Sequence, residues 1–240
     1  MIRLNEDHHV HSTFSDGRGT VLEMAEKARA MGLRELGFAD HVRRSSDWLE
    51  SYIEAIADAQ AQVPEVKLHV GVEAKMLDRL GTIDMPELPK GIDRVIIADH
   101  QIPGYAKPIH PKLVRRGIEA GLLRPETVIE RLVESTRLAI LQCPRPVIVG
   151  HLFSILPKAG IQADSVDPAV VDPLLEACLE HGARIEIDER WSCPSLAIAR
   201  RALAAGVEVI ASSDSHVVAA VGRYRYVRAL SEELALAAVA

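Results

Sequence analysis

The stretch DHHVHSTFSDG, residues 7–17, decides how the rest of the chain is interpreted. Its eleven residues contain three of the ten histidines of the chain and two aspartates. If its first half forms a strand, His9 and His11 point to the same face, because side chains two positions apart in a strand share a side. His8 then points to the opposite face and is expected to lie outside the site, whereas Asp16 follows in the turn. So dense a group of imidazoles and carboxylates predicts a site that other segments of the chain complete.

Downstream of this stretch, apolar runs alternate with helical patterns. Short apolar runs typical of buried strands are found at residues 36–40, 66–74, 93–99, 145–150, 183–188 and 207–214. Helices are predicted at residues 20–32, 48–63, 125–142, 172–182, 193–206 and 231–240. With the opening segment this makes seven strands, most of them separated by helices. The alternation predicts an α/β fold of one domain, residues 1–240, with a parallel sheet that is either open or closed into a barrel.

Ionisable side chains recur where the predicted strands end. Nine candidates stand there: His9, His11, Asp16, His41, Glu73, His100, His151, Asp214 and His216. The carboxyl ends of parallel strands share one edge, where α/β proteins build their active sites. A single histidine in such a place is more often a hydrogen-bonded surface residue, but six histidines and three carboxylates are better explained together, as ligands of several metal ions. Nitrogen and oxygen ligands without thiolates suit Zn²⁺, Mn²⁺ or Fe.

The composition narrows the class of protein. Hydrophobic residues make up 48% of the chain, enough for a substantial core. A net charge of −6 and an aromatic share of 4% disfavour binding of extended nucleic acid, which uses basic grooves and stacking platforms. The three cysteines form no CxxC pair, and no segment has the apolar character of a signal peptide or a membrane span. These features predict a cytoplasmic protein without a membrane partner, and they leave open whether it forms a homo-oligomer.

One segment is less regular than the rest. Residues 101–117, QIPGYAKPIHPKLVRRG, carry proline and glycine at short intervals, and we predict a long functional loop there. His110 lies in this segment and is a candidate contact for a substrate.

Taken in order, several short motifs resemble those of the polymerase and histidinol phosphatase (PHP) family. They are HxH with SDG, then ADH, VEA, a histidine at a strand end, VGH and SSDSH, and together they extend from Asp7 to about Gly222. Each motif alone is weak, but the ordered set is specific. The resemblance implies a distorted seven-stranded, TIM-like (β/α)7 barrel with a trinuclear metal site.

Carried over residue by residue, the resemblance implies a ligand set for each of three divalent ions. The first ion would take His9, His11, Glu73 and Asp214. The second would share Glu73 as a bridge and add His100 and His151. The third would take Asp16, His41 and His216.

The resemblance also implies a metal-dependent phosphoesterase with a small phosphorylated substrate. A metal-bridging hydroxide held by Glu73 would be the nucleophile, with His216 and Asp99 as candidate proton donors. Arg43 and Arg190 are the preferred phosphate-binding residues, because each closely follows a predicted strand end.

A phosphatase for a small monoester is the leading hypothesis, with histidinol phosphate as one candidate substrate. Two alternatives stay open: a phosphoesterase for nucleotides, oligonucleotides or cyclic phosphates, and a PHP module that binds metal without catalysis. A metal-dependent amidohydrolase is a weaker hypothesis, because such barrels share HxH in their first strand but usually lack the SDG and SDSH surroundings.

Overall fold

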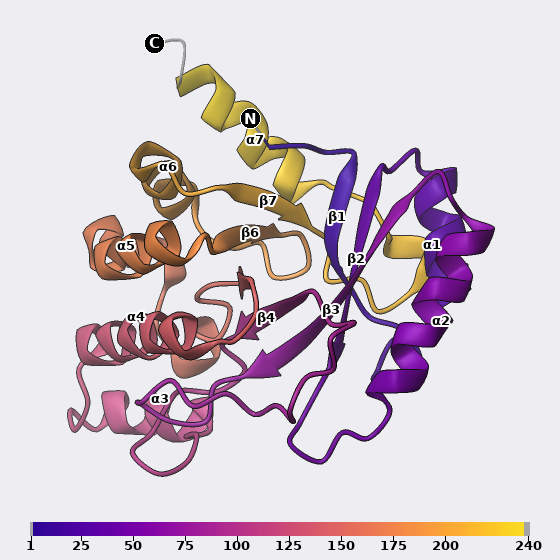
Figure 1. The fold of residues 1–240 in the computed structure, drawn as a ribbon. Coiled ribbons are helices and arrows are strands. Elements are labelled where there is room, and N and C mark those ends of the chain that lie inside the picture. Colours follow the sequence, from indigo (N-terminus) through magenta and orange to yellow (C-terminus); the bar gives the residue numbers. More distant parts are fainter. Residues whose placement is uncertain (1, 238–240) are drawn as a thin grey trace.

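In the computed structural model, which describes residues 2–237, seven parallel strands follow one another around a barrel (Figure 1). The strands are β1 (Glu6–Val10), β2 (Glu35–His41), β3 (Lys67–Lys75), β4 (Arg94–Ala98), β5 (Val147–Gly150), β6 (Arg184–Asp188) and β7 (Val209–Ser212). Each strand pairs with the next one in the chain. Between the first and last strands, Val10 forms a parallel bridge with Ser215, and the N–H of His11 donates to the Ser215 carbonyl over 2.9 Å. The barrel is therefore nearly closed, and the predicted distorted (β/α)7 barrel is confirmed.

Helices connect the strands and cover the outside of the barrel. They are α1 (Val21–Ala30), α2 (Leu49–Gln62), α3 (Pro111–Glu119), α4 (Pro125–Gln142), α5 (Asp172–His181), α6 (Leu196–Ala205) and α7 (Tyr226–Ala237). Four short 3₁₀ helices lie in the connections: η1 (Pro157–Ala159), η2 (Ala163–Ser165), η3 (Pro168–Val171) and η4 (Val218–Ala220). In Figure 1, α1 and α2 lie on one side of the barrel, and α4, α5 and α6 on the other. Every helix within residues 2–237 is too short or too polar to pass through a lipid bilayer.

The start of α1 illustrates how local chemistry sets a boundary. The hydroxyl of Thr20 accepts the N–H of Glu23 over 3.2 Å, and the Glu23 carboxylate accepts the N–H of Thr20 over 2.8 Å. This reciprocal capping box satisfies two N–H groups that have no partner within the helix. It fixes where the chain turns from the loop after β1 into the first helix.

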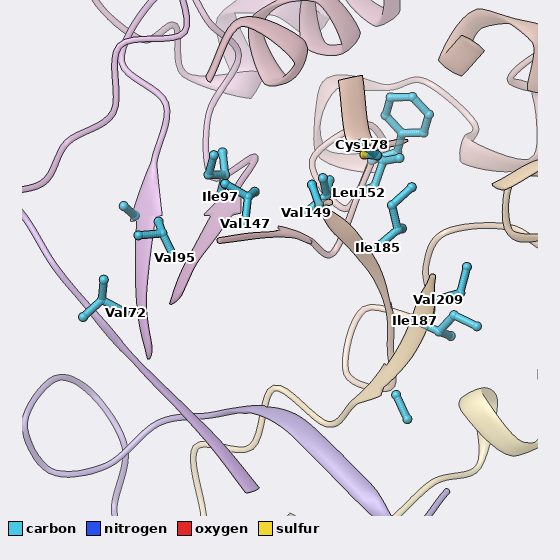
Figure 2. Close-up of a cluster of buried hydrophobic side chains, with 14 of the residues drawn as sticks. Val72, Val95, Ile97, Val147, Val149, Leu152, Cys178, Ile185, Ile187 and Val209 are labelled. Atoms are coloured by element: carbon cyan, nitrogen blue, oxygen red, sulfur yellow. The ribbon is translucent and has the colours of Figure 1, made fainter. Parts of the chain in front are cut away.

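The two faces of the strands bury different side chains. Outward-facing branched residues pack beneath the helices (Figure 2), among them Val95, Val147, Val149, Ile185 and Ile187. A separate apolar cluster of inward-facing residues consists of Ala39, Ile96, Ile148 and Ile210. Burial on both faces explains why the strand sequences are nearly continuous apolar runs. The inner cluster is the apolar floor on which the ionisable rim is built.

Two predicted segments differ from the structure. The prediction of a loop over residues 101–117 is wrong in its second half, because α3 begins at Pro111 and continues to Glu119. Proline fits the first position of a helix, so a residue taken as a loop signal instead marks a helix start. The last helix begins at Tyr226 rather than at residue 231, and its predicted final residues, 238–240, lie outside the described residues.

Candidate metal centre

The carboxyl-end rim of the barrel brings together the nine residues that the sequence places at strand ends. They are His9, His11, Asp16, His41, Glu73, His100, His151, Asp214 and His216. Five of them are buried, His41, His100 and His216 are partly exposed, and Asp16 is exposed. The cluster therefore runs from the barrel interior to the solvent, as a site that must admit a ligand requires.

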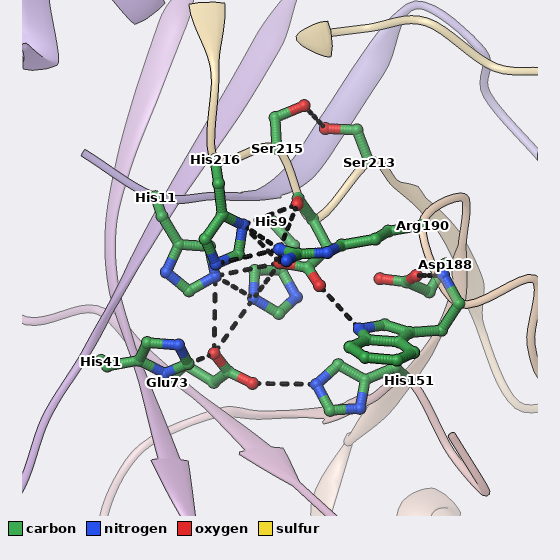
Figure 3. A network of polar contacts seen from close by, with 12 residues as sticks. His9, His11, His41, Glu73, His151, Asp188, Arg190, Ser213, Ser215 and His216 are labelled. Atoms are coloured by element: carbon green, nitrogen blue, oxygen red, sulfur yellow. Dashed lines mark hydrogen bonds and ion pairs between the residues drawn. The ribbon is translucent and has the colours of Figure 1, made fainter. Parts of the chain in front are cut away.

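Glu73, near the end of β3, connects the residues of this cluster, and Figure 3 shows its carboxylate between His41 and His151. Its carboxylate is 1% exposed and meets five imidazole rings. Its Oε2 lies 2.8 Å from His41 Nδ1 and 3.5 Å from Nε2 of both His9 and His11. Its Oε1 lies 3.0 Å from Nε2 of both His100 and His151. The two oxygens thus face two different groups of rings, so Glu73 could serve as a ligand to two cations at once.

Asp16 organises the exposed side of the cluster. Its Oδ1 lies 3.3 Å from His216 Nε2 and 3.7 Å from His11 Nδ1, and its Oδ2 lies 3.6 Å from His41 Nε2. These four side chains could hold one metal ion, since their ligand atoms all lie within 4.8 Å of one another. Similar groups are formed by His9, His11 and Glu73 and by His41, Glu73 and His100.

Asp40 holds the turn that carries Asp16. Its side chain accepts hydrogen bonds from the backbone N–H and the hydroxyl of both Ser12 and Ser15, over 2.7–3.0 Å. Gly17 completes the turn, because a Cβ at that position would lie 2.3 Å from the carbonyl oxygen of His11. The motif that follows β1 is therefore fixed by a residue of β2.

Two of the candidate ligands adopt a backbone conformation that is rare outside glycine. The φ angles are +24° at His151 and +48° at Asp214. Positive φ values in other residues cost free energy and cluster at functional sites. Asp214 Oδ1 lies 3.1 Å from His11 Nε2, and the Trp191 indole donates to Oδ2 over 2.9 Å. The strained conformation thus places the Asp214 carboxylate in the cluster.

Hydrogen bonds within the cluster do not reach all of its buried polar atoms. His11 Nδ1 and Asp214 Oδ1 are buried and have no hydrogen-bond partner. Burial alone would raise the pKa of Glu73, but the charges of His100 and His9 hold the pKa well below its ordinary value. A buried, ionised carboxylate requires positive charge nearby, which protonated imidazoles or bound cations can supply.

Sequence reasoning missed two acidic residues of the same rim, Glu186 and Asp188 on β6. Both are 0% exposed, and with His9 they form a further group that could hold a metal ion. Glu186 lies 3.1 Å from His9 Nδ1 and accepts the N–H of His151 over 2.6 Å. Burial raises the pKa of Asp188 well above its ordinary value, and the charges of Glu186 and Asp214 add to the effect. The sequence RIEID could have indicated these residues. Its two carboxylates are two positions apart at a strand end, with the same spacing as the two histidines of HVH.

Asp99 and Arg190, both named from the sequence, contact candidate ligands. Asp99 Oδ1 lies 3.3 Å from His151 Nδ1 and accepts the hydroxyl of Ser154 over 2.8 Å. It approaches the ring nitrogen of His151 that faces away from Glu73. The guanidinium of Arg190 lies 3.0 Å from His216 Nε2 and 3.6 Å from Asp214 Oδ1.

Arg43, the other predicted phosphate contact, lines a cavity of about 660 Å³ that also includes the side chains of His41, Glu73 and His100. The geometry therefore places both predicted arginines beside the cluster.

The fold and the rim together define a (β/α)7 barrel protein with a histidine- and carboxylate-rich site at the carboxyl ends of its strands. The sequence model of the PHP domain matches residues 7–190, and the chain belongs to the PHP family. It is 28% identical over 250 aligned positions to a probable phosphatase of Caldanaerobacter subterraneus subsp. tengcongensis, covering 97% of this chain and 84% of that protein. It is 27% identical to a probable phosphatase of Acetivibrio thermocellus, covering 95% and 86%.

A solved structure shares the fold. The histidinol phosphate phosphatase of Lactococcus lactis subsp. lactis, crystallised with zinc, L-histidinol and phosphate, superposes with a TM-score of 0.69. The match covers 95% of this chain and 93% of that one at 18% sequence identity. This likeness supports the barrel architecture.

Proposed function

We propose that this chain is a metal-dependent phosphatase that hydrolyses a small phosphate monoester at the cluster centred on Glu73. The observation that carries the proposal is the convergence of nine histidine and carboxylate side chains on one rim, where five of the imidazoles face the buried carboxylate of Glu73. Membership of the PHP family and relatives named as probable phosphatases support the same activity.

The residues of the cluster suit three divalent cations, in the sets that the family resemblance implies. His9, His11, Glu73 and Asp214 would hold the first, Glu73, His100 and His151 the second, and Asp16, His41 and His216 the third. The unpartnered atoms His11 Nδ1 and Asp214 Oδ1 support this fit. Zinc has the support of the Lactococcus structure, and Mn²⁺ or Fe suits the same donors. When bound, such ions supply a hydroxide nucleophile at neutral pH and neutralise charge on the phosphate.

The surrounding residues would orient the ligands and bind the phosphate. Asp99 faces His151 Nδ1, so we assign it the positioning of that ring rather than proton donation. Arg190 contacts both ring nitrogens of His216, Nδ1 more closely than Nε2, and a nitrogen that accepts a hydrogen bond cannot bind a cation at the same time. Arg190 would therefore turn away when the third ion binds, which frees its guanidinium for a phosphate oxygen.

The test is metal analysis combined with phosphate release from a panel of monoesters, histidinol phosphate among them, after loading with Zn²⁺ or Mn²⁺. A chelator should abolish the release, and added metal should restore it. Glu73→Ala should lose two ions per chain and at least about 100-fold in activity, because a catalytic metal supplies several kcal/mol of transition-state stabilisation.

Glu54→Ala, a change at an exposed position of α2, is the matched control and should keep both metal and activity. A fully metallated protein that releases phosphate from none of the monoesters would overturn the proposal.

A further inference from the structure

A second cavity, of about 490 Å³, adjoins the metal centre. Its polar lining comes from the loop after β4, the start of α3 and the 3₁₀ helix η1, and consists of His100, Gln101, His110, Lys112, Arg115 and Lys158. Pro111 and Ile155 are buried and form its apolar part. The cavity is separate from the two larger ones that open directly on Asp16.

The charge of this cavity is of one sign. Three cationic side chains line it, whereas no carboxylate does. Within the described residues, Lys112 and Lys158 have no carboxylate oxygen within 4.0 Å of their ammonium groups. Arg115 pairs with Glu119 through Nε, over 2.9 Å, which leaves its terminal N–H groups for another acceptor. Uncompensated cations around a concave surface form a site for an anion.

The position of Lys112 strengthens the case. It lies in the first turn of α3, which contains no acidic residue. The N-terminal end of a helix carries partial positive charge, so a cation there is unfavourable unless an anion compensates it. His110 accepts the N–H of Lys112 at Nδ1 over 3.2 Å, so a neutral His110 ring keeps Nε2 as an N–H donor.

The cavity shares His100 and Gln101 with the cavity beside Glu73, and Lys158 connects it to the metal centre through Trp191. His100 lines it and lies 3.0 Å from Glu73 Oε1. Lys158 stands 4.0 Å from the centroid of the Trp191 ring, and the indole of Trp191 in turn donates to Asp214. A ligand whose phosphate lies at the metal centre can therefore extend past His100 and Trp191 toward the lysines.

We infer that the substrate carries a second anionic group, a phosphate or a carboxylate, which Lys112, Arg115 and Lys158 bind while the first phosphate is hydrolysed. This inference rests on the proposed phosphatase activity and names the class of its substrate. The same cations would repel an ammonium group, so a phosphate ester of an amino alcohol such as histidinol should be a poorer substrate.

The test compares kcat/KM on matched esters with the metal-loaded protein. Glycerol 3-phosphate has one anionic group and 3-phosphoglycerate adds a carboxylate, whereas fructose 6-phosphate and fructose 1,6-bisphosphate differ by a second phosphate. Histidinol phosphate represents the ammonium class. In each pair, we expect the ester with the second anionic group to have the higher kcat/KM. The pair in which that group raises kcat/KM more shows whether the site prefers a phosphate or a carboxylate.

The double variant Lys112→Gln/Lys158→Gln should lower kcat/KM for the substrates with a second anionic group about tenfold or more, mainly through KM, because it removes charged hydrogen bonds. Its kcat/KM for glycerol 3-phosphate and its inhibition by orthophosphate should not change. Lys90→Gln, at an exposed position away from the cavity lining, is the matched control.

Equal losses on all esters, or none on any, would overturn the inference while leaving the phosphatase activity standing. Failure to hydrolyse any ester would instead count against the proposed function.

Discussion

At the scale of single residues, Glu186 connects two candidate ligands that are distant in sequence. It lies 3.1 Å from His9 Nδ1 and accepts the backbone N–H of His151. An imidazole that donates from Nδ1 to a carboxylate presents Nε2 in a fixed orientation and becomes a stronger ligand. Burial alone would lower the pKa of His9, but the charges of Glu186 and Glu73 raise it well above the ordinary value. Glu186 is thus a positioning residue, which orients His9 and the backbone of His151.

Glu186→Gln tests this role, because it keeps the shape of the side chain and removes its charge. We expect metal affinity to fall about 10- to 100-fold, the range found when such supporting groups are lost. Competition with a coloured chelator measures the affinity without any substrate. Glu130→Gln on the exposed face of α4 is the control and should bind as the parent protein does. Unchanged affinity in Glu186→Gln would mean that His9 needs no such partner.

At the scale of elements, the short strand β5 depends on a glycine at its end. A Cβ at Gly150 would lie 2.6 Å from Ile96 Cγ2 and 3.4 Å from Glu186 Oε1. Because glycine has no side chain, β5 can pack closely beside the inner apolar cluster, and His151 follows directly at the rim.

Gly150→Ala should therefore lower the free energy of unfolding by about 1–3 kcal/mol, the usual cost of overpacking a core. Urea denaturation measures the loss. The double variant with Ile96→Ala should lose less than the sum of the two single variants, because the smaller residue makes room for the new methyl group. Strict additivity would show that the strain lies elsewhere.

The elements also show what could be predicted from sequence. The helix Pro125–Gln142 has the bounds that the sequence predicts, because its apolar face determines both its structure and its burial. The six strands after β1 differ from their predicted ranges by at most two residues at either end. The nine rim residues could be named because the ends of parallel strands meet at one edge. The sequence did not predict α3, because proline and glycine, here Pro111 and Gly117, are also typical of loops.

Contacts across the barrel could not be predicted in the same way. The contact between Glu186 and His9 joins residues on β6 and β1, and no local pattern specifies it. Asp99 could be named as a candidate, but its orientation toward His151 depends on how β4 and β5 align.

At the scale of the whole molecule, the barrel has a cluster of ionisable side chains at each end. The two clusters differ in whether their buried nitrogen and oxygen atoms have hydrogen-bond partners within the protein. At the amino end, His8, Glu35 and His69 lie close enough to hold a cation. Their ring nitrogens already have partners, however: His8 Nε2 lies 3.0 Å from Glu6, His8 Nδ1 lies 3.3 Å from Arg94, and His69 Nε2 lies 2.5 Å from Glu35. His8 is thus outside the rim cluster, but not because it simply alternates with His9: a register shift in β1 between Asp7 and Val10 lets it contact Arg94 and lie beside His69.

The rim at the other end leaves buried ligand atoms without partners, including His11 Nδ1. This contrast is the reason for assigning metal ions to the rim and a structural role to the amino-end network. The network should then reveal itself through the pH dependence of stability rather than through metal binding.

Asp93, whose Oδ2 lies 3.7 Å from His69 Nδ1, also belongs to the amino-end network and is the member best suited to that test. Its carboxylate accepts the N–H of Val70 over 3.1 Å and pairs with Arg94 Nε over 2.8 Å. Burial alone would raise the pKa of Asp93, but the contacts with His69 and Arg94 hold it below the ordinary value. A carboxyl group whose pKa is lower in the folded state stabilises the fold above about pH 4, and that stabilisation is lost as the pH falls further.

We therefore expect Asp93→Asn to lower the free energy of unfolding by about 1 kcal/mol at pH 6, a modest value because the carboxylate is partly exposed. At pH 3 the difference from the parent protein should shrink, since the parent has begun to lose the same interaction. Urea denaturation of chelator-treated protein at both pH values separates this effect from metal loss. Asp58→Asn, at an exposed position of α2, should unfold like the parent at either pH. A difference for Asp93→Asn that stays constant or grows as the pH falls would show that the Asp93 carboxylate is not held ionised by the network.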